Sequence, residues 1–170
     1  MLNPHRIINK KLSDGTVIIR DAISSPTIRK GYERQIPTLA GVDRAHTRGA
    51  GLGKEYAEGI FYASKEVNRI LQNQGIERFL RELFQEKKSE VILYLSTETR
   101  PVPGSLKLME IIYSVDAVFN NKAFGLFELS IEVNNDEKNP RAKVTEPTQF
   151  RHYSEILKPI KRDAKNNIIN

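Results

Sequence analysis

Residues 41–59 combine the residue types of an acid–base site with a backbone that can fold back on itself. This stretch holds five of the ten glycines, together with Arg44, His46, Arg48 and Glu55. Glycine accepts positive φ angles and lets a ligand approach the backbone. Histidine is the side chain whose ordinary pKa lies closest to neutrality. We therefore expect this glycine-rich loop to carry the functional site.

These four polar side chains suit the cleavage of RNA without a metal ion. Such cleavage needs a base for the ribose 2′-hydroxyl, an acid for the leaving oxygen and cations for the charge of the transition state. His46 can act as base or acid, and Glu55 is the matching carboxylate. Arg44 and Arg48 can each bind two phosphate oxygens. A structural loop histidine and a carboxylate in the first turn of a helix would give the same pattern.

A second polar cluster follows the apolar run 91–95. The run has the length of a strand and predicts a central strand covered on both faces. We expect an exposed loop after it, in which Thr97 and Thr99 complete the catalytic site and Arg100 binds nucleic acid. A solvated loop cation would explain Arg100 equally well.

The net charge of +6 is concentrated at the two ends of the chain. Residues 1–52 carry nine Lys and Arg against four Asp and Glu, and 135–170 carry eight against five. A basic surface attracts polyanions such as nucleic acid. The N-terminal cations expected to bind nucleic acid are Lys10, Lys11, Arg29, Lys30 and Arg34. A solvated surface that keeps the protein in solution is the alternative.

The composition indicates one folded domain with short extensions. The chain has 170 residues, of which 39% are apolar, so it can bury a sizeable core. It has no run of about 18 apolar residues that would predict a transmembrane helix, and residues 1–6 lack the apolar core of a signal peptide. Cysteine is absent, which excludes a disulfide framework and a thiolate site.

Hydrophobic spacing predicts an α+β fold. Residues 7–12 and 16–20 flank Ser13-Asp14-Gly15, which predicts an N-terminal arm made of a β-hairpin. Prolines and serines predict irregular structure for 22–40. Apolar residues recur with a period of 3.6 up to residue 88, which predicts helices at 64–73 and 76–88, separated by Gly75. Beyond residue 88 strand patterns follow, which predict strands at 91–95, 109–115, 127–133 and 142–146. We therefore predict two helices packed on a three- to four-stranded antiparallel sheet.

The predicted elements divide the chain into three parts. Residues 1–40 are the basic hairpin arm and an irregular linker, 41–147 are the catalytic domain, and 148–170 are a basic C-terminal helix or tail. Within the last part a helix is predicted around 153–160, and the end of the chain is expected to be loose.

Three stretches together resemble a known family: 44–55 with Gly59-Ile60, 67–81, and 127–132 after Ile112-Tyr113. They resemble the C-terminal toxin domains of bacterial polymorphic toxins, in particular the group called type 4, over roughly 40–145. Such domains end large delivery proteins of the Rhs or contact-dependent inhibition kind. The resemblance implies a secreted antibacterial effector that is delivered into the cytoplasm of a target bacterium and neutralised by a cognate immunity protein. It implies no catalytic mechanism.

The predicted order of helices followed by an antiparallel sheet is also similar to small toxin ribonucleases of the barnase and colicin type. A likeness of fold does not determine function, but it places RNA of the target cell first among the substrates. We therefore predict a metal-independent ribonuclease.

ADP-ribosyl transfer is the alternative enzyme activity, with NAD as cosubstrate and a translation component or another molecule as target. Some transferases use an Arg, a Ser-Thr pair on a strand and a catalytic Glu. The residues that could imitate this set are Arg44, Ser96-Thr97-Glu98, and Glu128 or Glu132. A solvent-facing row of carboxylates would explain the last two equally well. A non-catalytic RNA- or protein-binding module is the third possibility, although few aromatic residues are left for stacking bases.

The sequence shows no metal or cofactor signature. Its histidines, His5, His46 and His152, are scattered and lack a compact ligand spacing. The glycines within 49–53 follow no predicted strand of a βαβ unit, so they do not form a dinucleotide fingerprint. We therefore expect neither a metal ion nor a bound cofactor, and a Mg²⁺ site made of a few carboxylates is the one alternative left open.

Overall fold

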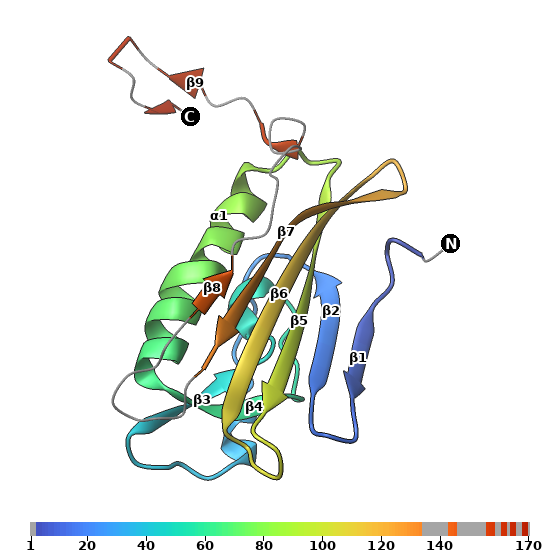
Figure 1. The fold of residues 1–170 in the computed structure, drawn as a ribbon. Helices are drawn as coiled ribbons and strands as arrows, with labels where there is room; N and C mark the ends of the chain where they lie inside the picture. The colour runs from blue at the N-terminus through green and yellow to red at the C-terminus, as the bar shows by residue number, and fades with distance from the viewer. Residues whose placement is uncertain are drawn as a thin grey trace.

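The computed structural model describes residues 3–133 and, beyond them, 143–145, 156–158, 161–162, 164–165 and 168–169. An antiparallel sheet is the largest unit of the fold (Figure 1). Its strands, in spatial order, are β1 (Ile8–Lys11), β2 (Val17–Ala22), β5 (Ile92–Pro101), β6 (Leu108–Phe119), β7 (Lys122–Glu132) and the short β8 (Lys143–Thr145). The α+β class and the antiparallel sheet are confirmed, and the sheet has more strands than the sequence predicts.

The N-terminal hairpin is part of this sheet and does not project as an arm. Strand β2 pairs with β5 from Val17 opposite Thr99 to Ala22 opposite Tyr94. Its inward-facing Val17 and Ile19 are 2% and 0% exposed. Burial of these apolar side chains favours docking on the core over an isolated ribbon, which is marginal in water.

A second hairpin contains the glycine-rich stretch. Strands β3 (Val42–His46) and β4 (Ile60–Ser64) pair antiparallel, and residues 47–59 connect them through a short 3-10 turn, η2 (Ala50–Leu52). Both ends of the predicted loop are therefore strands. The segment before it, expected to be irregular, contains one 3-10 turn, η1 (Tyr32–Gln35).

One continuous helix replaces the two predicted helices. It consists of an 11-residue π-helical part, η3 (Glu66–Ile76), followed by the 10-residue α1 (Glu77–Glu86). Gly75 lies inside it, so the predicted break is wrong. A helical glycine costs about 1 kcal/mol relative to alanine, and the burial of Val67, Leu80 and Leu83 outweighs that cost. None of the described helices is long and apolar enough to cross a membrane.

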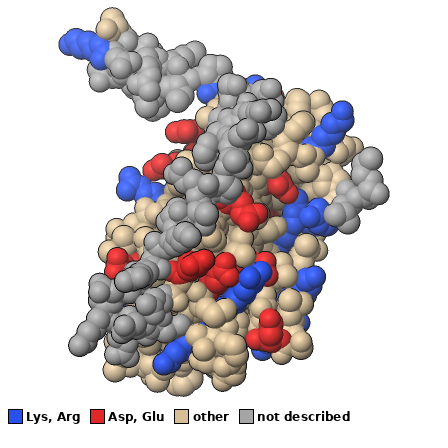
Figure 2. All heavy atoms as spheres, in the orientation of Figure 1, with Lys and Arg blue, Asp and Glu red and all other residues tan. Residues whose placement is uncertain are grey.

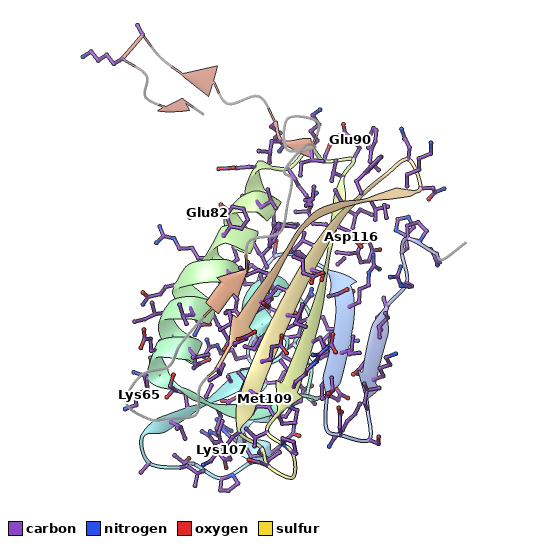
Figure 3. All side chains as sticks on the ribbon, in the orientation of Figure 1. Lys65, Glu82, Glu90, Lys107, Met109 and Asp116 are labelled. Carbon is purple, nitrogen blue, oxygen red and sulfur yellow. The ribbon has the colours of Figure 1, made fainter. Side chains whose placement is uncertain are left out.

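The hydrophobic core lies between this helix and one face of the sheet. Leu80 and Leu83 from α1 and Leu95, Ile111 and Tyr113 from the sheet belong to one buried cluster. Exposed side chains such as Glu82 point outward from the helix (Figure 3). On the face turned to the viewer in Figure 2, acidic and basic side chains lie side by side.

Little of the predicted C-terminal region falls within the described residues. The predicted edge strand at 142–146 is confirmed as β8. Of the predicted helix at 153–160 only 156–158 are described, and Lys88 N–H donates to Ile156 C=O at 2.7 Å. The short strands β9 (Lys161–Arg162) and β10 (Ile168–Ile169) pair with each other.

We predict that Gly59→Ala destabilises the fold more than Gly104→Ala. Both glycines have positive φ, 77° and 70°, which costs an alanine roughly 1–2 kcal/mol. A Cβ at position 59 would also collide with the Thr47 hydroxyl and lie 3.0 Å from Val17 Cγ1, whereas none of the described atoms lies within 4 Å at position 104. Urea unfolding should show an additional loss of about 1–3 kcal/mol for Gly59→Ala. Equal losses for the two variants would contradict this packing.

Candidate active site

His46 stands at the end of β3, between two carboxylates. Its Nε2 lies 3.3 Å from Glu55 Oε1 and 3.5 Å from Glu33 Oε2. The proximity of His46 and Glu55 that the glycine-rich stretch predicts is confirmed. Glu33 comes from η1 and was not among the predicted site residues.

The glycine-rich connection folds back and fixes Glu55. Tyr56 N–H donates to Arg48 C=O, and Gly53 adopts a φ of 117° that an L-residue rarely takes. Lys30 N–H donates to Glu55 Oε2 at 2.7 Å, and the Glu55 side chain is only 2% exposed. The carboxylate is therefore held between a backbone donor and the imidazole, with its freedom to turn toward solvent removed.

Arg44 holds the segment that carries Glu33. Its Nη1 donates to the carbonyl oxygens of Glu33 and Ile36, each at 3.2 Å. These bonds dock the 3-10 turn onto β3, so that the Glu33 carboxylate reaches the imidazole. Arg44 thus acts as a tether and also lines the pocket in front of His46.

A polar pocket of about 180 Å³ opens in front of His46. Its walls come from the segment before β3, from the glycine-rich connection and from the helix. The charged residues that line it are Arg29, Glu33, Arg44, His46, Glu55, Glu77 and Arg81, and the amides Asn68, Gln72 and Asn73 complete the helical wall. The pocket thus brings together three guanidinium groups, which can each bind two phosphate oxygens, with three carboxyl groups and one imidazole.

Burial shifts the pKa values of two groups in this pocket. Burial lowers the pKa of His46 below its ordinary value and outweighs the raising effects of Glu55 and Glu33. Burial likewise raises the pKa of Glu77 against the lowering effects of Arg81, Arg29 and Arg48. Within the described residues, His46 Nε2 is buried and makes no well-oriented hydrogen bond. The pocket therefore offers a neutral imidazole that can accept a proton and a carboxyl group that retains one more readily.

Arg48 does not line this pocket. Its side chain is completely buried, and its guanidinium donates to four carbonyl oxygens. These acceptors belong to Asp21, Ala22, Leu52 and Leu95, at distances of 2.6–3.3 Å. Arg48 thus ties the glycine-rich connection to β2 and β5. Its guanidinium N–H groups bind carbonyl oxygens and not, as predicted, a phosphate.

Thr97 and Thr99 lie inside β5. The strand continues to Pro101, so the predicted exposed loop after residue 95 is wrong. The side chains alternate toward the core, which leaves Thr97 0% and Thr99 1% exposed. Thr99 Oγ1 shares a hydrogen bond of 2.7 Å with Thr47 Oγ1, whereas Thr97 Oγ1 has no partner among the described residues.

The predicted nucleic-acid-binding cations occupy several different surfaces. Arg29 lines the His46 pocket, while Lys10, Lys11, Lys30 and Arg34 are exposed. Arg100 forms ion pairs with Glu98 at 3.1 Å and with Glu110 at 3.2 Å on the outer face of the sheet. Their binding of nucleic acid stays a prediction.

The residues considered for ADP-ribosyl transfer are not joined by any described contact. Arg44 bonds to the η1 segment, whereas Glu98 pairs with Arg100 and Glu128 accepts from Ser114 on the outer sheet face. Thr97 points into the core.

One group of described residues could hold a metal ion. Glu33, His46 and Glu55 each offer a ligand atom, and these atoms lie within 4.8 Å of one another. An imidazole with two carboxylates is a donor set that divalent transition metals accept.

Sequence reasoning missed the helical wall of the pocket because its spacing is not that of an α-helix. Asn68 and Asn73, like Gln72 and Glu77, are five residues apart, and η3 is π-helical, with i→i+5 hydrogen bonds. In an α-helix, residues five apart would point about 140° away from each other. A polar stripe with a spacing of five was the signal that could have found them. Glu33 has no comparable signal.

Comparisons with known proteins support one family. The family model described as bacterial toxin 4 (Ntox4) matches residues 39–123, half of the 170-residue chain. This span contains β3, β4, the whole helix, β5 and β6, and therefore most of the pocket. No curated protein and no solved structure matches the chain significantly.

We predict that Arg48→Met destabilises the protein because it removes the guanidinium bonds to four carbonyl oxygens, of which Leu52 C=O also accepts from Ser24 N–H. Each unsatisfied buried group costs about 1–3 kcal/mol. The free energy of unfolding in urea should fall by at least about 3 kcal/mol. The matched control is Arg100→Met, whose side chain is 42% exposed and should lose less than about 1 kcal/mol. Similar losses at both positions would count against the structural role.

We predict that the imidazole of His46 titrates below its ordinary pKa of 6.5. Because the folded state disfavours the protonated form, His46 stabilises the fold fully above that pH and loses this contribution as the pH falls through its lowered pKa. Glu55→Gln keeps an acceptor for Lys30 N–H but removes a charge that raises the pKa, so the midpoint should fall further. NMR titration of the imidazole measures the pKa of His46 in the unmodified protein and in Glu55→Gln. A midpoint above 6.5 in either protein contradicts the predicted lowering of this pKa.

Proposed function

The chain belongs to the bacterial toxin 4 family, and on that premise we propose that it is an antibacterial effector domain that cleaves RNA of a target cell. The observation that carries the proposal is the imidazole of His46, set between Glu33 and Glu55 in a pocket lined by guanidinium groups. Delivery by a larger fused protein, action in the cytoplasm of the target bacterium and neutralisation by a cognate immunity protein belong to the same proposal.

His46 is the general base of the proposed reaction. Its lowered pKa favours the neutral imidazole, whose unprotonated ring nitrogen can accept the proton of a ribose 2′-hydroxyl. The 2′-oxygen then attacks the neighbouring phosphorus. The carboxylates of Glu55 and Glu33 stabilise the imidazolium that forms, since both lie within 3.5 Å of Nε2.

Glu77 is the carboxyl group best suited to act as the general acid. Its raised pKa favours the protonated form, which can donate to the leaving 5′-oxygen while a 2′,3′-cyclic phosphate is released. The arginines of the pocket stabilise the negative charge of the transition state. Arg29 is the least committed of them, because its side chain forms no hydrogen bond or ion pair with any described residue.

We predict that the purified protein fragments total RNA in the presence of EDTA and without NAD. His46→Ala should abolish toxicity and slow cleavage by about 10²–10⁴-fold, as expected for the loss of an acid–base group. Glu55→Ala should also abolish toxicity, because it removes the buried carboxylate that stabilises the imidazolium. His5→Ala is the matched control, because His5 contacts Tyr94 and Asn121 away from the pocket. Circular dichroism of each variant establishes that it is folded.

Three outcomes would contradict this function. A folded His46→Ala protein with full toxicity removes the proposed base. Cleavage that stops in EDTA points to a metal ion at Glu33, His46 and Glu55. Transfer of label from NAD to a component of cell extract, with intact RNA, selects the ADP-ribosyltransferase alternative.

A further inference from the structure

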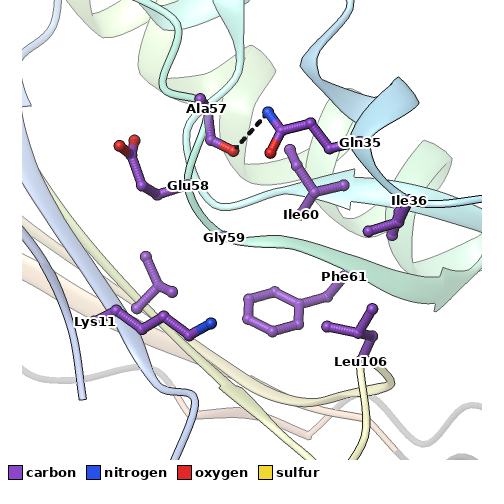
Figure 4. A pocket seen from close by; sticks show the side chains of 10 residues that line it. Lys11, Gln35, Ile36, Ala57, Glu58, Gly59, Ile60, Phe61 and Leu106 are labelled. Carbon is purple, nitrogen blue, oxygen red and sulfur yellow. Dashed lines mark hydrogen bonds between the residues drawn. The ribbon is translucent and has the colours of Figure 1, made fainter. Parts of the chain in front are cut away.

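A second cavity, of about 330 Å³, is lined by residues of η1, β4 and the neighbouring hairpins (Figure 4). Two segments contribute to both this cavity and the His46 pocket. In the segment around η1, Glu33 lines the His46 pocket and Ile36 lines the second cavity. In the glycine-rich connection, Glu55 lines the His46 pocket and Glu58 lines the second cavity. Ile60, which also lines the second cavity, is the cross-strand partner of His46. A ligand in this cavity would therefore lie one strand away from His46.

The backbone of Ile60 presents a donor and an acceptor to this cavity. Thr47 N–H donates to Gly59 C=O, and Tyr62 N–H donates to Leu106 C=O on the other side of β4. Because successive residues of a strand alternate in direction, Ile60 N–H and C=O point to the Leu106 side, where the cavity lies. Within the described residues neither group has a hydrogen-bond partner.

The walls of the cavity suit a flat ring. Ile36, Phe61 and Leu106 supply apolar surface, and the exposed Lys11 extends toward the Phe61 ring (Figure 4). A planar heterocycle with a hydrogen-bond donor next to an acceptor can pair with the N–H and C=O of one extended residue. Nucleobases have such an edge, and so does the carboxamide of nicotinamide. Lys11 supplies a cation to the lining of the same cavity.

We infer that this cavity binds a planar nitrogen heterocycle through the Ile60 backbone. Resting on the proposed function, the ligand is a base of the RNA substrate, held so that its neighbouring phosphate faces His46. The cavity then determines which nucleotide stands at the cleavage site. The same edge chemistry in a nicotinamide ring would come from NAD.

The test is an NMR titration of the ¹⁵N-labelled full chain with ligand pairs that differ by one methyl group. The pairs are GMP and its 1-methyl derivative, UMP and its 3-methyl derivative, and nicotinamide and N-methylnicotinamide. We expect at least one unmethylated ligand to shift the Ile60 amide resonance and to bind at least tenfold more tightly than its methylated partner, because the methyl group blocks the donor. If no ligand shifts this resonance, or if every methylated partner binds equally well, the inference is overturned.

A substitution at the rim gives an independent check. Leu106→Trp should fill the cavity and weaken binding at least tenfold, while its backbone keeps the bond to Tyr62 N–H. Leu39→Trp is the matched control, since both leucines are 44% exposed and Leu39 does not line the cavity. Unchanged binding in Leu106→Trp overturns the inference. If nicotinamide is the only ligand that binds and RNA is not cleaved, the inference is supported and the ribonuclease is rejected. If RNA is cleaved but no ligand shifts the Ile60 resonance, the ribonuclease is supported and the inference is rejected.

Discussion

The buried guanidinium of Arg48 is the interaction on which the site depends. A cation removed from water is costly unless hydrogen bonds compensate it. Here four carbonyl oxygens of β2, β5 and the glycine-rich connection accept from its two terminal nitrogens, while Nε has no partner among the described residues. Burial lowers the pKa of this arginine, but an arginine stays protonated in proteins. The arrangement therefore holds only while the connection remains folded against both strands, because any departure would leave a charge without partners.

This constraint explains how a glycine-rich segment can position reactive groups. Glycines allow the sharp turns, but they also give the unfolded chain more conformations to lose. Arg48 fixes the near end of the connection, and the Lys30 N–H bond to Glu55 fixes the far end. His46 lies just before this connection, on a strand whose register is set by its pairing with β4. The imidazole and the carboxylate thus meet because both are held by backbone contacts.

The sequence predicted those features that depend on local chemistry. Alternation of apolar residues located β6 and β7, and the glycines around His46 and Glu55 predicted that these two side chains meet. The predictions from the sequence were wrong where tertiary contacts determine the structure. Whether Arg48 faces phosphate or carbonyl oxygens depends on which strands pack around it. Thr97 and Thr99 are buried only because β5 continues for six residues beyond its apolar part. Gly75 does not end the helix because the apolar face on both sides of it is buried.

The π-helical turn links the fold to the chemistry of the pocket. An α-helix that buried Val67 and Leu80 would not bring Gln72 and Glu77 onto one line, because residues five apart diverge in it. The wider turn aligns them, and α1 then adds Arg81 one ordinary turn after Glu77. Gln72 is 1% exposed and its Nε2 donates to Tyr113 OH, so this alignment is anchored in the core. Restoring α-helical geometry by deleting one residue of η3 would therefore rotate Glu77 and Arg81 relative to the residues before them. The polar wall facing His46 exists only because the helix is irregular where it meets the pocket.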